Sequence, residues 1–202
     1  NLALAIENLN KLPTPTSTQA QALQTQLTTD LNTYNAELRR LITALKEQGY
    51  TDLQPVADLA NLNSSILKTS KELEEQLLQD NQYSLPNLTL LAREQSLLMQ
   101  SIAADYAARS ASVGASFFAD GEKQPLDKLS EIFANNLASM QSNPKNTSDT
   151  SKALRTLQVK WNYIEGSLNN YNEDSVPFVI DKYARSITQA LEQLAAEYAL
   201  LN

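Results

Sequence analysis

The chain has 202 residues and a formal net charge of −7, from 16 Lys and Arg against 23 Asp and Glu. Acidity spread along the chain argues against a nucleic-acid partner, because neutralising phosphates takes clustered cations. The absence of Cys and His excludes thiol chemistry, Cys/His zinc sites and an imidazole general base. With 4 Gly and no phosphate-binding or nucleophile-elbow motif, we expect no enzyme, no cofactor and no metal site.

The first half of the chain shows helical spacing of its apolar residues. A short helical piece is expected over residues 1–12, before a Pro-containing break. Leucines recurring every three or four residues then predict a long helix over residues 17–48, ended by Gly49. Asp52 is expected to cap the next helix, which continues to about Asp80.

The same spacing continues through the second half of the chain. A third long helix is expected to open at residues 84–86 and to end near Asp120 and Gly121, and a shorter one begins at Pro125. Residues 141–150 read as the clearest loop, because they are rich in Asn, Ser and Pro. A stripe around Trp161 predicts the next helix, and Pro177 opens the last.

These elements predict an all-α, elongated antiparallel bundle of six or seven helices, because short links place successive helices antiparallel. We expect one helical-bundle domain over residues 1–202, with both chain ends at the same end of the bundle. A similar order of aromatic, Asp and Pro residues in the two halves leaves open two stacked modules, 1–83 and 84–202.

No run of about 18 apolar residues is present, so no membrane span is expected within the chain. The first and last residues already follow a helical pattern, which is expected for a domain excised from between two membrane helices. The expected location is therefore periplasmic or extracytoplasmic, as part of an inner-membrane protein. A Cys-free acidic composition agrees with that expectation.

The stretch Leu90–Ala103, "LLAREQSLLMQSIA", resembles a known sensory motif. It is similar to the helix A-G-R-Q-R-M-L-S-Q-R-I-A of the N-terminal sensory domain of type IV pilus methyl-accepting chemotaxis transducers, a family that includes nitrate/nitrite sensor kinases. The resemblance extends to a later Trp-containing helix, about as far as Ala196, and implies a helical ligand-sensing domain. The matching positions are Ala92, Gln95, Leu98, Gln100, Ile102 and Ala103.

The departures from that motif bear on the ligand. The three motif arginines fall on Glu94, Ser96 and Ser101, and the motif glycine falls on Arg93. Binding a nitrate ion takes convergent positive charge, because the anion must be desolvated. The resemblance therefore implies the scaffold and leaves the ligand open.

Polar residues on this helix are the candidate ligand-binding residues. Arg93 and Gln95 form a solvated polar face in the reading that we favour, whereas Gln100 lies two residues from both Leu98 and Ile102. Asp105 and Arg109, spaced i,i+4, would bind a zwitterion or an organic acid if they point inward; we favour a surface ion pair instead. Trp161 lies on a leucine stripe, so we expect it in the core.

The expected function is ligand sensing by a bacterial transmembrane receptor, either a chemoreceptor or a sensor kinase. Its partners would be an unidentified small-molecule or protein ligand, a membrane reached through flanking segments, and a second copy. We expect the homodimer to pair through the N-terminal segment and the helix near Pro177. The alternative is a structural or adhesive secreted helical bundle without a small-molecule ligand, which the richness in Gln, Asn, Ser and Thr favours.

The substituted arginines generate a first prediction. The chain should bind neither nitrate nor nitrite tightly, because Glu94, Ser96 and Ser101 supply no positive charge. Isothermal titration calorimetry with sodium nitrate, and with sodium chloride as the ionic-strength control, measures this. A micromolar dissociation constant for nitrate would contradict the prediction.

Overall fold

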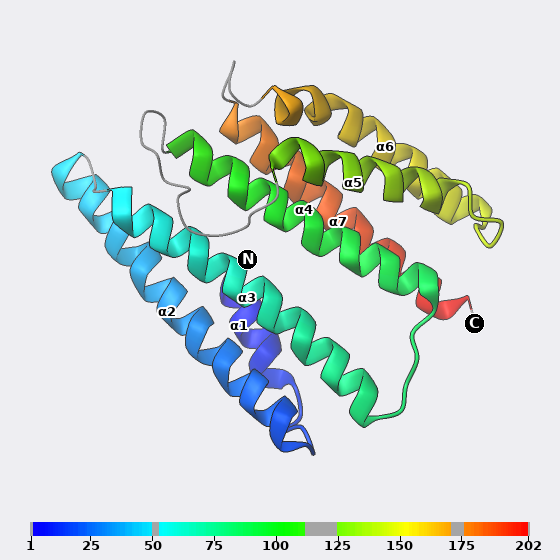
Figure 1. The fold of residues 1–202 in the computed structure, drawn as a ribbon, viewed down its shortest axis with the longest axis horizontal. Helices are drawn as coiled ribbons and strands as arrows, with labels where there is room; N and C mark the ends of the chain where they lie inside the picture. The colour runs from blue at the N-terminus through cyan, green and yellow to red at the C-terminus, as the bar shows by residue number, and fades with distance from the viewer. Residues whose placement is uncertain (1, 50–52, 112–124, 171–175, 202) are drawn as a thin grey trace. The chain divides into compact units, whose positions relative to one another are not determined.

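The computed structural model describes residues 2–49, 53–111, 125–170 and 176–201 (Figure 1). Seven α-helices and no strand lie within these ranges, so the all-α helical bundle is confirmed. The predicted features at Asp52 and at Asp120 and Gly121, together with both chain ends, lie outside the described residues. The helices are α1 Leu2–Lys11, α2 Thr18–Gln48, α3 Leu53–Asp80, α4 Asn87–Ala111, α5 Leu126–Gln141, α6 Ser148–Asn169 and α7 Pro177–Leu200.

The chain divides into two compact units, residues 1–84 and residues 85–202. The division lies one residue from the boundary between the two modules that the sequence left open. We call these unit 1, which contains α1 to α3, and unit 2, which contains α4 to α7. Each unit has a separate hydrophobic cluster, and each is described by itself.

Unit 1 is a long antiparallel hairpin of α2 and α3, with the short α1 packed against α2 (Figure 1). Ser17 caps α2, because its Oγ accepts a hydrogen bond from the Ala20 N–H at 3.2 Å. Gly49 ends α2 with φ of 78° and donates its N–H to the Leu45 carbonyl, as the sequence predicted. The Ser17 hydroxyl also bonds the Asp80 carboxylate, which ties the start of α2 to the end of α3.

The core of unit 1 joins all three of its helices. Its buried members are Leu9 of α1, Ala20, Leu27 and Leu31 of α2, and Leu73 of α3. Leu31 is the last residue of α2 in this cluster, so the rest of α2 lies outside it.

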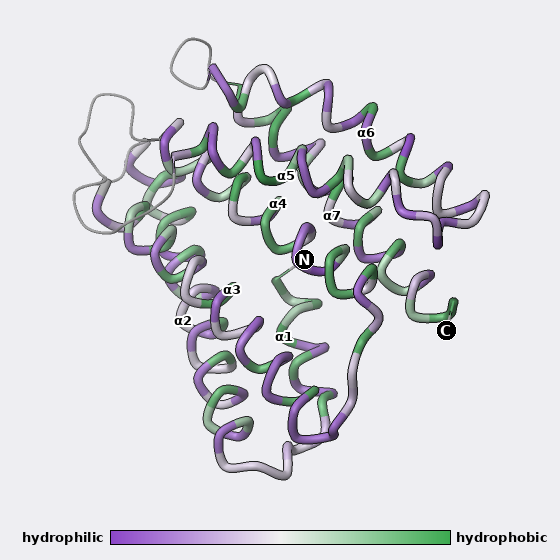
Figure 2. Tube along the Cα trace, turned by 45° about the vertical axis from the view of Figure 1, so that its right-hand side comes forward, coloured by the Kyte–Doolittle hydropathy of each residue, from purple (hydrophilic) through white to green (hydrophobic). Residues whose placement is uncertain are grey.

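Unit 2 is an antiparallel four-helix bundle. α4 packs against α5 and α7, and α6 also packs against α5 and α7, so the four helices form a closed ring. Figure 1 shows successive helices running in opposite directions, as the short links predicted. Along each helix in Figure 2, hydrophobic and hydrophilic stretches alternate, as amphipathic helices require.

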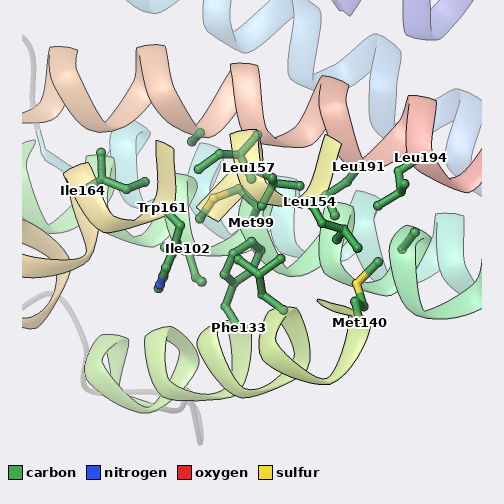
Figure 3. Packing of buried hydrophobic residues seen from close by; sticks show 14 of the residues in the cluster. Met99, Ile102, Phe133, Met140, Leu154, Leu157, Trp161, Ile164, Leu191 and Leu194 are labelled. Carbon is green, nitrogen blue, oxygen red and sulfur yellow. The ribbon is translucent and has the colours of Figure 1, made fainter. Parts of the chain in front are cut away.

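The core of unit 2 contains one of the largest fully buried side chains in the chain, Trp161. It lies on a stripe of α6 with Leu157 and Ile164, all at most 1 % exposed, and its core position is confirmed. The ring of Phe133 on α5 packs against it, with centroids 4.4 Å apart (Figure 3). Aromatic pairs of this kind contribute beyond the area that they bury.

The link between α5 and α6 is shorter than predicted, since α5 ends at Gln141 and α6 already begins at Ser148. The expected loop 141–150 is therefore wrong at its C-terminal end. Thr147 is the N-cap, and its hydroxyl and that of Thr150 accept each other's backbone N–H at 3.2 and 2.8 Å. This capping box starts a helix within a composition that is typical of loops.

Asn146 connects this link by hydrogen bonds to α5 and α7. Its Nδ2 donates to the Met140 carbonyl at 2.7 Å, and its Oδ1 accepts from the Tyr198 hydroxyl at 2.6 Å. Tyr198 lies near the end of α7 and is 2 % exposed. The hydrogen bond therefore joins the α5–α6 link to the last turns of α7.

The Asn146–Tyr198 bond generates a second prediction. Tyr198→Phe should lower the free energy of unfolding by about 1 kcal/mol, because it removes one partly buried hydrogen bond and leaves the packing intact. Urea titration followed by circular dichroism measures the change. Tyr163→Phe is the control, because Tyr163 is 63 % exposed and its hydroxyl makes no hydrogen bond to the described residues. Equal effects of the two substitutions would contradict the assigned role of Asn146.

Candidate functional site

One stripe of α4 faces the core of unit 2. Gln95 lies on this stripe, three residues after the buried Ala92 and four residues before the buried Met99. Residues at such spacings lie above one another on the same helix face. Gln95 is thus an interior residue of the bundle. The full stripe is Leu88, Ala92, Gln95, Met99, Ile102 and Tyr106.

The side chain of Gln95 is almost completely buried, with 1 % of its surface exposed. Its amide oxygen Oε1 has no hydrogen-bond partner among the described residues. A buried polar atom left without a partner costs about 1–3 kcal/mol, so such an atom in a folded core needs an explanation. The neighbours of Gln95 along the stripe, Ala92 and Met99, are both 0 % exposed, so solvent does not reach this part of the helix face.

Further buried polar atoms of unit 2 share this condition. Thr89 Oγ1 on α4, Ser130 Oγ on α5 and Trp161 Nε1 on α6 have no hydrogen-bond partner within the described residues. Ser130 precedes Phe133 by one helical turn, and Phe133 packs against Trp161. In Figure 3 the indole nitrogen of Trp161 lies on the side of the ring nearer α5. The interior of the bundle therefore contains both acceptors and an N–H donor that the described residues do not satisfy.

Gln100, the other glutamine in the motif, uses its amide nitrogen within its own helix. It is half-buried, and its Nε2 donates to the Ser96 carbonyl at 3.3 Å and contacts Ser96 Oγ at 3.5 Å. Leu98, which the sequence placed on the same inner face as Ile102, is only partly buried. Of the two glutamines in the motif, Gln95 is therefore the interior one, and the interpretation of Gln95 as part of a solvated face is wrong.

The remaining candidates lie elsewhere on α4. Arg93 is exposed, whereas Asp105 is 9 % exposed and Arg109 is half-buried. The favoured interpretation of Asp105 and Arg109 as a surface pair is thus wrong for the carboxylate, which is buried. Asp105 follows Gln95 by ten residues, about 15 Å along a helix. The five predicted residues therefore do not converge on one place.

The structure separates Gln95 from the other candidates for a reason that the sequence obscured. α4 has apolar side chains on several faces, including Leu91 and Leu98 at the edges of the core. Several phases of the helical repeat therefore fit its sequence about equally well. The 4,3,4,3,4 spacing from Leu88 to Tyr106 is the signal that would have identified Gln95, and Thr89 and Ser130 carried no such signal.

Comparison of the chain with protein families, with curated proteins and with solved structures finds no match. Within the described residues, no helix combines the length and the apolar character that crossing a membrane requires. The site is therefore defined by its own geometry: an uncharged, buried polar position at the centre of a four-helix bundle.

The burial of Gln95 generates a third prediction. Gln95→Leu should raise the free energy of unfolding by about 1 kcal/mol, because an apolar side chain of similar size replaces a buried amide whose oxygen is unsatisfied. Gln100→Leu is the matched control on the same helix and should change it by less than about 0.5 kcal/mol. Chemical denaturation of the purified variants measures both. Clear destabilisation by Gln95→Leu would mean that the amide has a structural partner.

Proposed function

We propose that the chain is the ligand-sensing module of a bacterial transmembrane receptor, a chemoreceptor or a sensor kinase, with its ligand held inside unit 2. In this proposal the module lies outside the cytoplasm, and membrane helices flank it in the intact receptor. The observation that carries the proposal is the buried, unsatisfied amide oxygen of Gln95 in the middle of α4.

Two facts support a ligand at this position. Cores of four-helix bundles are common places for ligand sites, which are built from side chains on facing helices. Of the six positions that match the motif of the sensory family, Ala92, Gln95 and Ile102 are interior residues of α4, and the other three are partly buried. The glutamine that the motif shares with this chain at Gln95 thus lies on the buried face of α4.

The chemistry of the interior defines the ligand class. Gln95 Oε1 can only accept, so the ligand must present an N–H or O–H donor to it. Trp161 Nε1 can only donate, so an acceptor on the ligand or on a bound water would satisfy it. The stripe of α4 from Leu88 to Tyr106 contains no charged residue, and the buried charged residue beside it, Asp105, is an anion. A small uncharged molecule with both donors and acceptors, such as an amide or a polyol, fits this environment better than an inorganic anion.

Signalling would follow from the packing of α4 against α7. A ligand that fits only one arrangement of these two helices shifts the population toward that arrangement. Displacements of about 1–2 Å between packed helices are a common way to transmit such a shift. α7 and a neighbouring membrane helix would carry the displacement onward.

The alternative is a structural or adhesive bundle with no small-molecule ligand. The open groove on unit 1 described below favours it, because a protein-binding surface would serve such a role. The two functions differ in what Gln95 does. In a structural bundle, removal of the amide stabilises the protein and changes nothing else.

A thermal-shift screen of amides, polyols, amino acids, organic acids and inorganic anions tests the proposal. A ligand of the intact module should raise the melting temperature of the wild type and of Gln100→Leu. It should not raise that of Gln95→Leu, whose own melting temperature is at or above that of the wild type. A ligand that shifts all three proteins equally binds elsewhere, and a screen without any shift favours the structural alternative.

A further inference from the structure

Unit 1 contains a groove between α2 and α3, next to the cluster that α1 completes. Its volume is about 410 Å³, and only residues of α2 and α3 line it. Most of the lining is apolar, and the charged members are Glu37, Arg40 and Asp58. The apolar lining residues are Leu41, Ala44, Pro55, Leu59 and Leu62.

The groove lies where the hairpin loses its third helix. The core cluster that includes α1 buries Leu27 and Leu31 of α2, which are 5 % and 7 % exposed. Beyond this cluster the leucine stripe of α2 continues, but Leu45 is 44 % exposed. Helices gain most of their stability by packing an apolar face, so this part of the hairpin has an incomplete core.

The charges of the groove are arranged on its two walls. Arg40 lies on the α2 wall and Asp58 lies on the α3 wall, so one groove presents a cation and an anion on opposite sides. Arg40 pairs with Glu37 only at 3.5 Å, and their side chains are 80 % and 44 % exposed. Such an exposed pair contributes little, which leaves the guanidinium able to take a second carboxylate.

We infer that a second copy of the chain covers this groove, so that two α2–α3 hairpins form an intermolecular four-helix bundle. A two-fold axis parallel to the hairpins places α2 of one copy against α3 of the other. Arg40 then faces Asp58 of the partner subunit, and the same pair recurs by symmetry. Every helix in this arrangement has antiparallel neighbours, the packing that unit 2 achieves within one chain.

A second copy fits the groove because the groove is self-complementary. A two-fold interface uses the same patch on both partners, so it needs both signs of charge on that patch and an apolar centre. The groove has Arg40, Asp58 and the apolar residues between them. This inference uses unit 1 alone and does not rest on the ligand proposed for unit 2. It differs from the dimer expected from the sequence, which used the N-terminal segment and the helix near Pro177.

Disulfide trapping of the full chain tests the inference directly, because the chain contains no Cys. Arg40→Cys chains and Asp58→Cys chains are mixed at concentrations on the order of 100 µM and oxidised. Neither variant can form an internal disulfide, so a crosslinked pair reports contact between copies. The mixture should give more crosslinked product than either variant alone. A control mixture of Asp58→Cys with Lys128→Cys, an exposed site in unit 2, should not.

Charge reversal provides the second test, in analytical ultracentrifugation. Arg40→Asp and Asp58→Arg each place like charges together twice per dimer, so each should raise the dimer dissociation constant about tenfold or more. The double variant restores opposite charges and should recover the dimer. Circular dichroism of each variant shows whether it is folded. A folded wild type that stays monomeric, crosslinking no greater than in the control mixture, or single reversals without effect would overturn the inference.

Discussion

The closed ring of helices in unit 2 is the constraint from which the candidate site follows. Because α4 and α6 each pack against both α5 and α7, the inner face of every helix is removed from water. Any polar group on an inner face must then find a partner within the bundle. Most of the interior side chains are apolar and have no group that needs a partner. Gln95 has an amide oxygen without a hydrogen-bond partner among the described residues.

A tyrosine hydroxyl makes a hydrogen bond at each end of α7. At one end the Val176 N–H donates to Tyr106 Oη at 2.9 Å, which fixes the start of α7 against the last turns of α4. At the other end Tyr198 donates to Asn146. These two bonds set the register of α7 within the bundle.

The two units bury their apolar stripes in different ways. Unit 2 has four helices of 16 to 25 residues and completes its core within the chain. Unit 1 has two long helices and a third of 10 residues, about 15 Å long, against 31 residues in α2. A helix of that length covers only part of the hairpin. The groove at Leu41 and Leu59 follows from this difference in length. The same difference is the reason for proposing that a second copy of the chain covers the groove.

The class of the fold, the order of the helices and most of their ends could be predicted from the amino-acid sequence. These follow from local physics: the spacing of Leu27, Leu31 and Leu38 is a property of consecutive residues, and so are the caps at Ser17 and Gly49. The start of α6 was also encoded locally, in the capping box of Thr147 and Thr150, but its loop-like composition concealed it. Which face of α4 lies inside the bundle depends on its packing against the other helices. Apolar residues surround that helix, so its own sequence fits several orientations. The packing of α5 and α7 selects the one that buries Gln95, satisfies Gln100 along the helix and leaves Arg93 in solvent.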